Sequence, residues 1–205
     1  MPEVLLATRN AGKLRELREI VAGTPLRWLG LNEFPAMRDA VEEGASFAEN
    51  ARAKALHYAA ATGLYTLADD SGLEVDMLGG APGVHSARYA GWPREDAANN
   101  RKLLAALGGA PPARRTARFR CAMAFARPGA ILCESEGTVE GIIIDVPRGE
   151  NGFGYDPLFL IPALDRTMAE LPAEHKHALS HRGRALRAML PQIEQFFRAA
   201  GQWAP

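Results

Sequence analysis

Asp69 and Asp70 are the residues of this sequence whose types and spacing point most directly to chemistry. They follow a short apolar run at residues 65–68, which predicts a strand, and we expect Ser71 and Gly72 to form a turn behind them. Adjacent carboxylates repel each other, and burying either without a compensating charge is costly. A positive group is therefore expected nearby, most simply a hard cation such as Mg²⁺. A plain Asx turn is the alternative, but ligands of α/β sheets gather at such strand ends.

The turn at residues 7–13, Ala-Thr-Arg-Asn-Ala-Gly-Lys, is the second candidate. It separates a predicted strand from a predicted helix, and amides at a helix N-terminus favour an anion. Lys13 adds a full positive charge, while the Thr8 hydroxyl and the Asn10 amide add hydrogen-bond donors. The spacing is not that of a Walker loop, and an ordinary turn with a solvated lysine fits the same residues.

Two acids, Glu42 and Glu43, come just before a helix whose start is predicted by a capping box at residues 46–49. On that helix Asn50 and Lys54 are four residues apart and share a face. Considered alone, this pattern favours a solvated acidic loop and an exposed lysine.

Glycines flank an aromatic residue in the segment 152–157, Gly-Phe-Gly-Tyr-Asp-Pro. With glycine on both sides, the ring face of Phe153 is expected to stay accessible, as stacking on a planar ligand requires. A turn that buries an aromatic anchor explains the same residues equally well.

Basic residues surround the start of the last predicted helix, where Lys176 precedes Ser180-His181-Arg182. We expect Ser180 to cap this helix, which places His181 and Arg182 in its first turn, where cations oppose the helix dipole. That local conflict indicates that they face a ligand. A basic, solvated helix start is the alternative, and it suits His177.

The elements that must position these residues alternate along the first part of the chain. Apolar periodicity predicts a mixed-sheet α/β protein, a single domain over residues 1–205 in one body or in two lobes with a cleft between them. Pro191 is expected to kink or interrupt the last helix. Strands are predicted at residues 3–8, 26–29, 65–68, 116–125, 131–144 (broken by glycines) and 158–161, and helices at 13–21, 46–61, 94–107 and from 180 onward.

Composition excludes several classes of function. The net charge of the 205 residues is zero, so a dominant electrostatic grip on nucleic acid is not expected, and an RNA-binding module built on the arginine-bearing strand near residue 118 is a poor alternative. No apolar run approaches the roughly 20 residues of a membrane span, and no secretory signal is recognised. Cys121 and Cys133 are expected to be reduced core residues, which fits a cytoplasmic protein.

Six motifs of this sequence, taken in order, resemble the inosine triphosphate pyrophosphatase family, also called the Ham1 or RdgB family. Each motif is weak alone, but the six together are specific and cover nearly the whole chain. They lie at residues 7–13, 46–51, 68–73, 79–84, 152–157 and 180–183.

The resemblance implies a fold with a long central mixed sheet flanked by helices, and two lobes with a nucleotide cleft between them. It implies a homodimer that hydrolyses deaminated purine nucleoside triphosphates (dITP, ITP, XTP and dXTP) to the monophosphate and pyrophosphate with Mg²⁺, cleansing the nucleotide pool. The alternatives are a Maf-like pyrophosphatase of other nucleotides and a nucleotide-binding protein that has lost catalysis.

The family pattern also assigns site residues in this chain. Glu42 and Asp70 match metal-binding positions, Asp70 is the usual candidate base, and Asp69 and Lys13 complete the catalytic set. Which aspartate takes the proton stays open, as does a share for Glu43 in metal binding. Arg9 stands where relatives often carry a small residue. Substrate-binding positions are Thr8, Arg9, Asn10, Ala11, Gly12, Lys13 and Lys54 for the triphosphate, and Ser71, Phe153, Gly154, Tyr155, Asp156, Lys176, His181 and Arg182 for the nucleotide.

Physical chemistry makes this assignment coherent. A water that attacks the α-phosphorus needs an aspartate to orient it or accept its proton, and Lys13 and Lys54 can offset charge on the departing pyrophosphate. Donors from Arg182 or His181 suit a purine 6-keto oxygen and would meet another donor in ATP. GTP also carries a 6-keto group, so the residues that reject it are not identified by the sequence.

Overall fold

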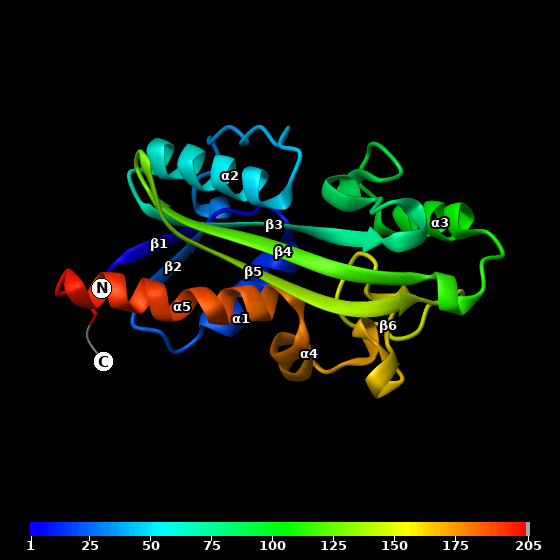
Figure 1. Ribbon diagram of the computed structural model, residues 1–205. Helices are drawn as coiled ribbons and strands as arrows, with labels where there is room; N and C mark the ends of the chain where they lie inside the picture. Colours follow the sequence, from blue (N-terminus) through cyan, green and yellow to red (C-terminus); the bar gives the residue numbers. More distant parts are fainter. Residues whose placement is uncertain (204–205) are drawn as a thin grey trace. The chain divides into compact units, whose positions relative to one another are not determined.

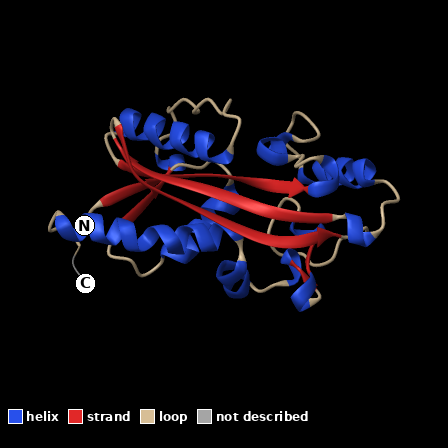
Figure 2. Ribbon diagram, in the orientation of Figure 1, coloured by secondary structure: helices blue, strands red, loops and turns tan. Residues whose placement is uncertain are grey.

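A seven-stranded mixed sheet organises the computed structural model, which describes residues 1–203 (Figures 1 and 2). The strand order is β2-β1-β3-β4-β5-β6-β7, with β1 parallel to β2 and β3, and β6 antiparallel to β5 and β7. The predicted fold class is therefore confirmed. The strands are β1 (Glu3–Leu6), β2 (Arg27–Gly30), β3 (Tyr65–Val75), β4 (Thr116–Arg127), β5 (Ala130–Ile143), β6 (Phe159–Ile161) and β7 (Arg166–Thr167), and the α-helices are α1 (Ala11–Val21), α2 (Phe47–Thr62), α3 (Asp96–Leu107), α4 (Ala173–Leu179) and α5 (His181–Ala199).

Two compact units make up the chain, and β3, β4 and β5 each contribute residues to both. The first unit contains residues 1–70, 121–137 and 182–205, and the second contains residues 71–120 and 138–181. Each unit is described by itself below. The single domain over residues 1–205 and the nucleotide cleft stay predictions.

The first unit places its strands between helices (Figure 1). Helix α2 lies over one face of the strands, while α1 and α5 lie over the other. The apolar residues of α5 recur at helical spacing, so one stripe of that helix is buried against the sheet. The core on this side contains Val4, Leu6, Leu17, Val21, Leu26, Leu67, Cys121, Met123, Phe125, Ala185, Leu186, Met189, Ile193 and Phe197.

Local signals fix both ends of α2, as the sequence predicts. The Ser46 hydroxyl accepts a hydrogen bond from the Glu49 amide at 3.2 Å, which satisfies one of the free amides of the first turn. Gly63 ends the helix in the left-handed conformation, with φ of 74°. The Glu49 carboxylate reaches back to the amide of Ala45, one residue before the capping serine.

A second hydrophobic core fills the second unit. It joins the apolar face of α3 to residues of β3, β4, β5 and β6 and to the segments on either side of β6. Its members are Leu73, Val75, Leu103, Leu107, Ala117, Phe119, Val139, Ile143, Tyr155, Leu158, Phe159, Ile161, Met168 and Leu171.

Strand β3 is longer than the sequence predicts, and the expected turn after Asp70 is wrong. The strand continues through Ser71 and Gly72 to Val75, so the two aspartates lie in its middle and not at its end. The reason is tertiary, because Leu73 and Val75 are fully buried and keep the segment in the sheet despite its turn-like composition. The argument that placed the aspartates at a carboxyl edge of the sheet therefore fails.

Three smaller expectations also differ from the structure. Gly137 and Gly141 do not interrupt β5, and helix α4 was not predicted. Pro191 lies inside α5 without ending it, so the expected interruption is wrong, while the kink stays a prediction. Met189 and Ile193 on either side of the proline are fully buried, so packing holds the helix across it.

Close packing around Gly72 yields the first testable prediction. A Cβ atom at this position would lie 2.3 Å from Ser86 Oγ and 2.6 Å from the Gly83 carbonyl oxygen, both within the second unit. We expect Gly72→Ala to lower the free energy of unfolding by about 2 kcal/mol, because the added methyl group overpacks a rigid contact. Chemical denaturation measures this effect.

Gly109→Ala is the matched control, since a Cβ there meets nothing within 4 Å. Equal stability of the two variants would contradict the close approach of β3 to the 3₁₀ helix Gly83–Arg88.

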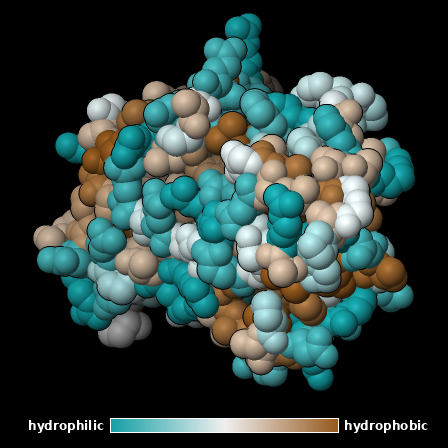
Figure 3. Space-filling view, turned by 45° about the vertical axis from the view of Figure 1, so that its right-hand side comes forward, coloured by the Kyte–Doolittle hydropathy of each residue, from teal (hydrophilic) through white to brown (hydrophobic). Residues whose placement is uncertain are grey.

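Hydrophilic and apolar residues are interspersed on the face shown in Figure 3. Among the described residues, no helix combines the length and the apolar character needed to cross a membrane. The large hydrophobic side chains that remain exposed are scattered along the chain, as is usual for protein surfaces. They are Met1, Val41, Met77, Trp92, Val146 and Leu164.

Candidate active site

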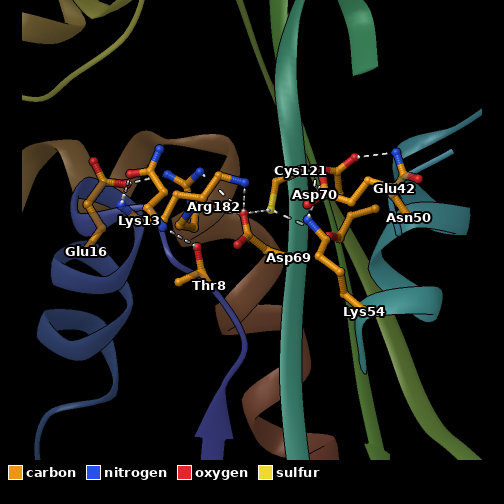
Figure 4. Close-up of polar contacts among 12 residues, drawn as sticks. Thr8, Lys13, Glu16, Glu42, Asn50, Lys54, Asp69, Asp70, Cys121 and Arg182 are labelled. Atoms are coloured by element: carbon orange, nitrogen blue, oxygen red, sulfur yellow. Dashed lines mark hydrogen bonds and ion pairs between the residues drawn. The ribbon is translucent and has the colours of Figure 1, made fainter. Parts of the chain in front are cut away.

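Asp69 and Asp70 lie on opposite sides of β3, within the first unit (Figure 4). Successive side chains of a strand point to opposite faces of the sheet, so adjacent carboxylates in a strand are separated. Asp69 faces the side of α1 and α5, and Asp70 faces α2. The two acids therefore do not form one paired-carboxylate site, and each has its own cations.

Buried charges of alternating sign surround Asp69. Its Oδ2 lies 2.9 Å from Lys13 Nζ of α1 and 3.4 Å from Arg182 Nε of α5. The guanidinium of Arg182 also contacts the carboxylate of Glu16, one helical turn beyond Lys13. Arg182, Glu16 and Asp69 are all less than 5% exposed. A buried carboxylate is tolerated when it is paired in this way.

The charges set the protonation states on this side of the sheet. Burial alone would raise the pKa of Asp69, but the positive charges of Lys13 and Arg182 outweigh it and hold that pKa well below its usual value. Burial, reinforced by the charge of Asp69, raises the pKa of the neighbouring Cys121 thiol to about 12. Cys121 is therefore a neutral thiol at neutral pH, not an activated nucleophile.

Asp70 contacts two donors from one face of α2. Lys54 Nζ lies 3.2 Å from its Oδ1, and Asn50 Nδ2 donates to its Oδ2 at 3.0 Å. The same ammonium lies 3.4 Å from Oε2 of Glu42, so Glu42 and Asp70 converge on one cation. Glu43, the neighbour of Glu42, is exposed.

Lys54 provides a test of whether a metal ion fits here. Burial would lower its pKa, but the charges of Asp70, Asp69 and Glu42 outweigh this and raise it. The Lys54 ammonium is thus a positive charge held between the carboxylates of Glu42 and Asp70. Carboxylate oxygens are the ligand atoms that a hard cation prefers. Within residues 1–203 no cluster of three or more histidine, cysteine or acidic residues could form a complete cage. Mg²⁺ needs only one or two carboxylates and keeps several waters, so these residues fit it.

The predicted anion-binding turn leads directly into α1. Asn10 is the N-cap, and its Oδ1 accepts from the Lys13 amide at 3.0 Å, while Thr8 Oγ1 accepts from the Asn10 amide at 3.2 Å. Ala11 and Gly12 form the first turn of the helix, whose N-terminus is the positive end of its dipole.

Arg9, which lies in this turn, is directed toward the segment before Glu42. Its guanidinium pairs with Asp39 and donates to the Met37 carbonyl oxygen at 2.6 Å. The side chains of this pair are 40% and 71% exposed, so the contact is a surface ion pair of small energetic value.

The second unit brings together the predicted nucleotide-binding residues around Phe153. Asp156 Oδ2 accepts from the Phe153 amide at 2.9 Å and pairs with Lys176 Nζ at 2.6 Å, and both charged side chains are only 5% exposed. The Lys176 ammonium also lies 5.1 Å from the centre of the Phe153 ring. The half-buried ring is thus held in place by a buried ion pair, and Phe153 is not the buried anchor of the alternative interpretation.

Gly154 and Tyr155 are tied to the rest of the second unit. The Gly154 amide donates to Asp96 Oδ2 at 2.7 Å, and the buried Tyr155 donates its hydroxyl proton to the Ser86 carbonyl oxygen at 2.8 Å. His181 stacks on Phe119 with ring centroids 4.9 Å apart. Tyr155 is therefore a structural anchor of this loop.

The remaining predicted residues lie in β3 and α5. Ser71 is half-buried in β3, and Arg182 lies with His181 in the first turn of α5 as expected. The contacts of Arg182 described above are to carboxylates of the first unit, which assigns it a place beside Asp69. Its predicted contact with a purine base stays a prediction.

Sequence reasoning missed Glu16 and did not assign Asn50 to the site. Glu16 follows Lys13 by three residues and is buried on a helix otherwise buried through leucine and valine, a pattern that could have marked it. Its partner is 166 residues away, so the pairing itself left no local signal. For Asn50, the sequence spacing indicates only that it shares a helix face with Lys54.

Fold and site together define a mixed-sheet α/β protein in which carboxylates, lysines and a helix N-terminus gather around one strand. A sequence model of the Ham1 family matches residues 4–192. The chain belongs to the Ham1 family.

Individual relatives agree over almost their full length. The chain is 48% identical to a dITP/XTP pyrophosphatase of Desulforamulus reducens, covering 95% of this chain and 97% of the relative. It is 54% identical to a protein of the same name from Gloeobacter violaceus, covering 91% and 92%. Among solved structures, a HAM1 protein from Coxiella burnetii aligns with a TM-score of 0.85 at 42% identity, over 95% of this chain and all of that one.

Proposed function

We propose that this protein hydrolyses deaminated purine nucleoside triphosphates, dITP and XTP foremost, to the monophosphate and pyrophosphate. Membership in the Ham1 family and relatives named dITP/XTP pyrophosphatase support the reaction class over a Maf-like activity. The observation that carries the proposal is the shared ammonium of Lys54, which brings Glu42 and Asp70 together beside a second lysine-bound carboxylate.

The two aspartates take different roles in this proposal. Asp70 orients the attacking water and accepts its proton, because it lies beside Lys54, whose ammonium also contacts Glu42, and its two oxygens are held in place by Lys54 and Asn50. Asp69 is fully buried under Lys13 and Arg182, so it anchors the Lys13 ammonium. An ammonium has three donors, and contact with Asp69 leaves the others for a phosphate oxygen.

Charge on the leaving pyrophosphate is offset by groups of the first unit. Lys13 and Lys54 supply the positive charges, and the N-terminus of α1, where Ala11 and Gly12 form the first turn, supplies the positive end of a helix dipole. Direct attack by water requires no covalent intermediate, and the nearby Cys121, whose pKa is raised by burial, is not an activated nucleophile.

Glu42 and Asp70 are the residues that would hold Mg²⁺. When bound, such an ion neutralises phosphate charge and polarises the phosphoryl oxygens. Arg9 contacts the segment before Glu42 through Asp39 and the Met37 carbonyl oxygen, but this exposed contact contributes little to the position of that segment.

Within the second unit, base recognition is assigned to Ser71, Phe153, Gly154, Asp156, Lys176 and His181, with Tyr155 as the buried anchor of the loop. The part predicted for Arg182, a residue of the first unit, stays a separate proposal. The Phe153 ring offers a face for stacking, and the buried Lys176–Asp156 pair keeps that ring in one position. A donor directed at the 6-keto oxygen of hypoxanthine or xanthine would leave the 6-amino group of adenine without an acceptor. Mismatched polar groups of this kind discriminate strongly.

Initial rates on a panel of nucleotides test the proposal. With Mg²⁺ present, we expect dITP and XTP to be hydrolysed at least about 100-fold more efficiently than ATP and dTTP, because a buried polar mismatch costs several kcal/mol. Pyrophosphate release measured alongside monophosphate formation identifies the bond that is cleaved.

Comparable kcat/KM values for ATP and dITP would contradict the proposed specificity. Release of orthophosphate in place of pyrophosphate would contradict attack at the α-phosphorus. The homodimer and the cytoplasmic location implied by the family resemblance belong to the same proposal, and sedimentation of the purified chain tests the first.

A further inference from the structure

Asn50 uses both ends of its side-chain amide, and it does so between two segments that carry proposed metal ligands. Its Nδ2 donates to Asp70 Oδ2 at 3.0 Å, and its Oδ1 accepts from the backbone amide of Gly44 at 2.8 Å (Figure 4 shows the first contact). Gly44 follows Glu42 by two residues. A single amide therefore ties the loop that carries Glu42 to the strand that carries Asp70.

The orientation of this amide is determined by its partners. The Gly44 N–H requires an acceptor and the Asp70 carboxylate requires a donor, so only one of the two amide orientations satisfies both. Asn50 is 2% exposed, which leaves little room for water to replace either contact.

The position of Asn50 along α2 makes the contact rigid. It lies one residue beyond Glu49, whose amide is bound by the capping Ser46. Lys54, one turn further along the same face, contacts the other oxygen of Asp70. One helix face thus supplies a donor to each oxygen of the carboxylate, which fixes the plane of that group.

Gly44 is shaped for the same contact. A Cβ atom there would lie 2.8 Å from Asn50 Oδ1 and 2.8 Å from the Cβ atom of Glu49. Only glycine allows the loop backbone to come this close to the start of α2.

We propose that Asn50 is a positioning residue that sets the orientation of the Asp70 carboxylate and the distance of the Glu42 loop from it. This inference rests on the proposed function, in which these two acids hold a divalent cation. Residues that orient metal ligands without touching the metal typically change metal affinity or activity by about 10- to 100-fold when they are replaced. Asn50 acts through its neighbours and needs no contact with substrate.

Mn²⁺ binding to the full-length protein, measured by electron paramagnetic resonance of the free ion, tests this role without relying on turnover. Asn50→Leu keeps the number and branching of the side-chain heavy atoms and removes both hydrogen bonds. We expect it to raise the dissociation constant for Mn²⁺ about tenfold, with a similar rise in the Mg²⁺ concentration that half-saturates dITP hydrolysis. The KM for dITP at saturating Mg²⁺ should change much less.

Asn99→Leu is a matched control in the second unit. Asn99 is also a buried helical asparagine with both amide ends bound, to the Ala90 amide at 2.7 Å and to the Ala87 carbonyl oxygen at 3.3 Å. We expect this variant to lose comparable thermal stability and to bind Mn²⁺ like the wild type.

Gly44→Ala approaches the same contact from the loop and keeps the test decisive if Asn50→Leu does not fold. It should also raise the dissociation constant for Mn²⁺. The double variant should have nearly the same dissociation constant as Asn50→Leu alone, because both changes break the same contact.

Unchanged Mn²⁺ binding in both single variants would overturn the inference, as would equal weakening in Asn99→Leu. A wild type that binds Mn²⁺ without hydrolysing dITP would contradict the proposed function alone, and the comparison of Mn²⁺ affinities would still decide the role of Asn50.

Discussion

Asp70→Asn is expected to lower kcat for dITP by about 10³-fold, because an amide cannot accept the proton of the attacking water. The substitution preserves size and removes the negative charge that faces Lys54. Lys54 still has Glu42 as a partner, so the fold should persist. Steady-state kinetics and thermal unfolding of the same preparation measure the two effects separately.

Asp76→Asn provides the control for this experiment. Asp76 is a carboxylate of the second unit whose partners are Thr116 and Arg118, and it is placed outside the proposed machinery. The kcat of Asp76→Asn for dITP should equal that of the wild type. Full activity in Asp70→Asn would remove Asp70 from the catalytic role and leave Asp69 as the remaining candidate.

Arg182→Met is expected to destabilise the fold by about 3–5 kcal/mol, the usual cost of removing one member of a buried ionic group. The guanidinium is the cation that Glu16 and Asp69 share, and all three groups are buried. Removing it also takes away one of the two cations that position the Asp69 carboxylate beside Lys13, so kcat should fall together with stability. Urea denaturation gives the stability change.

Arg198→Met is the comparison on the same helix. Arg198 is exposed and pairs with Glu194 one turn away, a contact worth only a few tenths of a kcal/mol. The double variant Glu16→Leu with Arg182→Met should recover part of the lost stability, because it removes both opposite charges together. A strictly additive double variant would show that Glu16 and Arg182 do not interact.

The predictions that the structure confirms rest on helix caps and short sequence motifs, which involve only a few neighbouring residues. Helix α2 was predicted at both ends because Ser46 and Gly63 act through their own backbone neighbours. The six motifs placed the chain in the Ham1 family because their order is specific even though each is short.

Expectations that depended on distant packing were less successful. Asp-Asp-Ser-Gly is a turn-like composition, and only the burial of Leu73 and Val75 shows why β3 continues through it. With the strand extended, its period of two would have separated Asp69 from Asp70 from the start. The pairing of Glu16 with Arg182 was beyond sequence reasoning because the fold alone brings α1 and α5 together.

A strand whose consecutive residues serve different helices can neither gain nor lose a single residue. Deleting one position between Tyr65 and Ala68 would rotate the following side chains by half a turn and exchange the two acids between Lys13 and Lys54. Point substitutions on one face, by contrast, leave the other face in register. Such a protein therefore tolerates amino-acid replacements along β3 but not insertions or deletions within that strand.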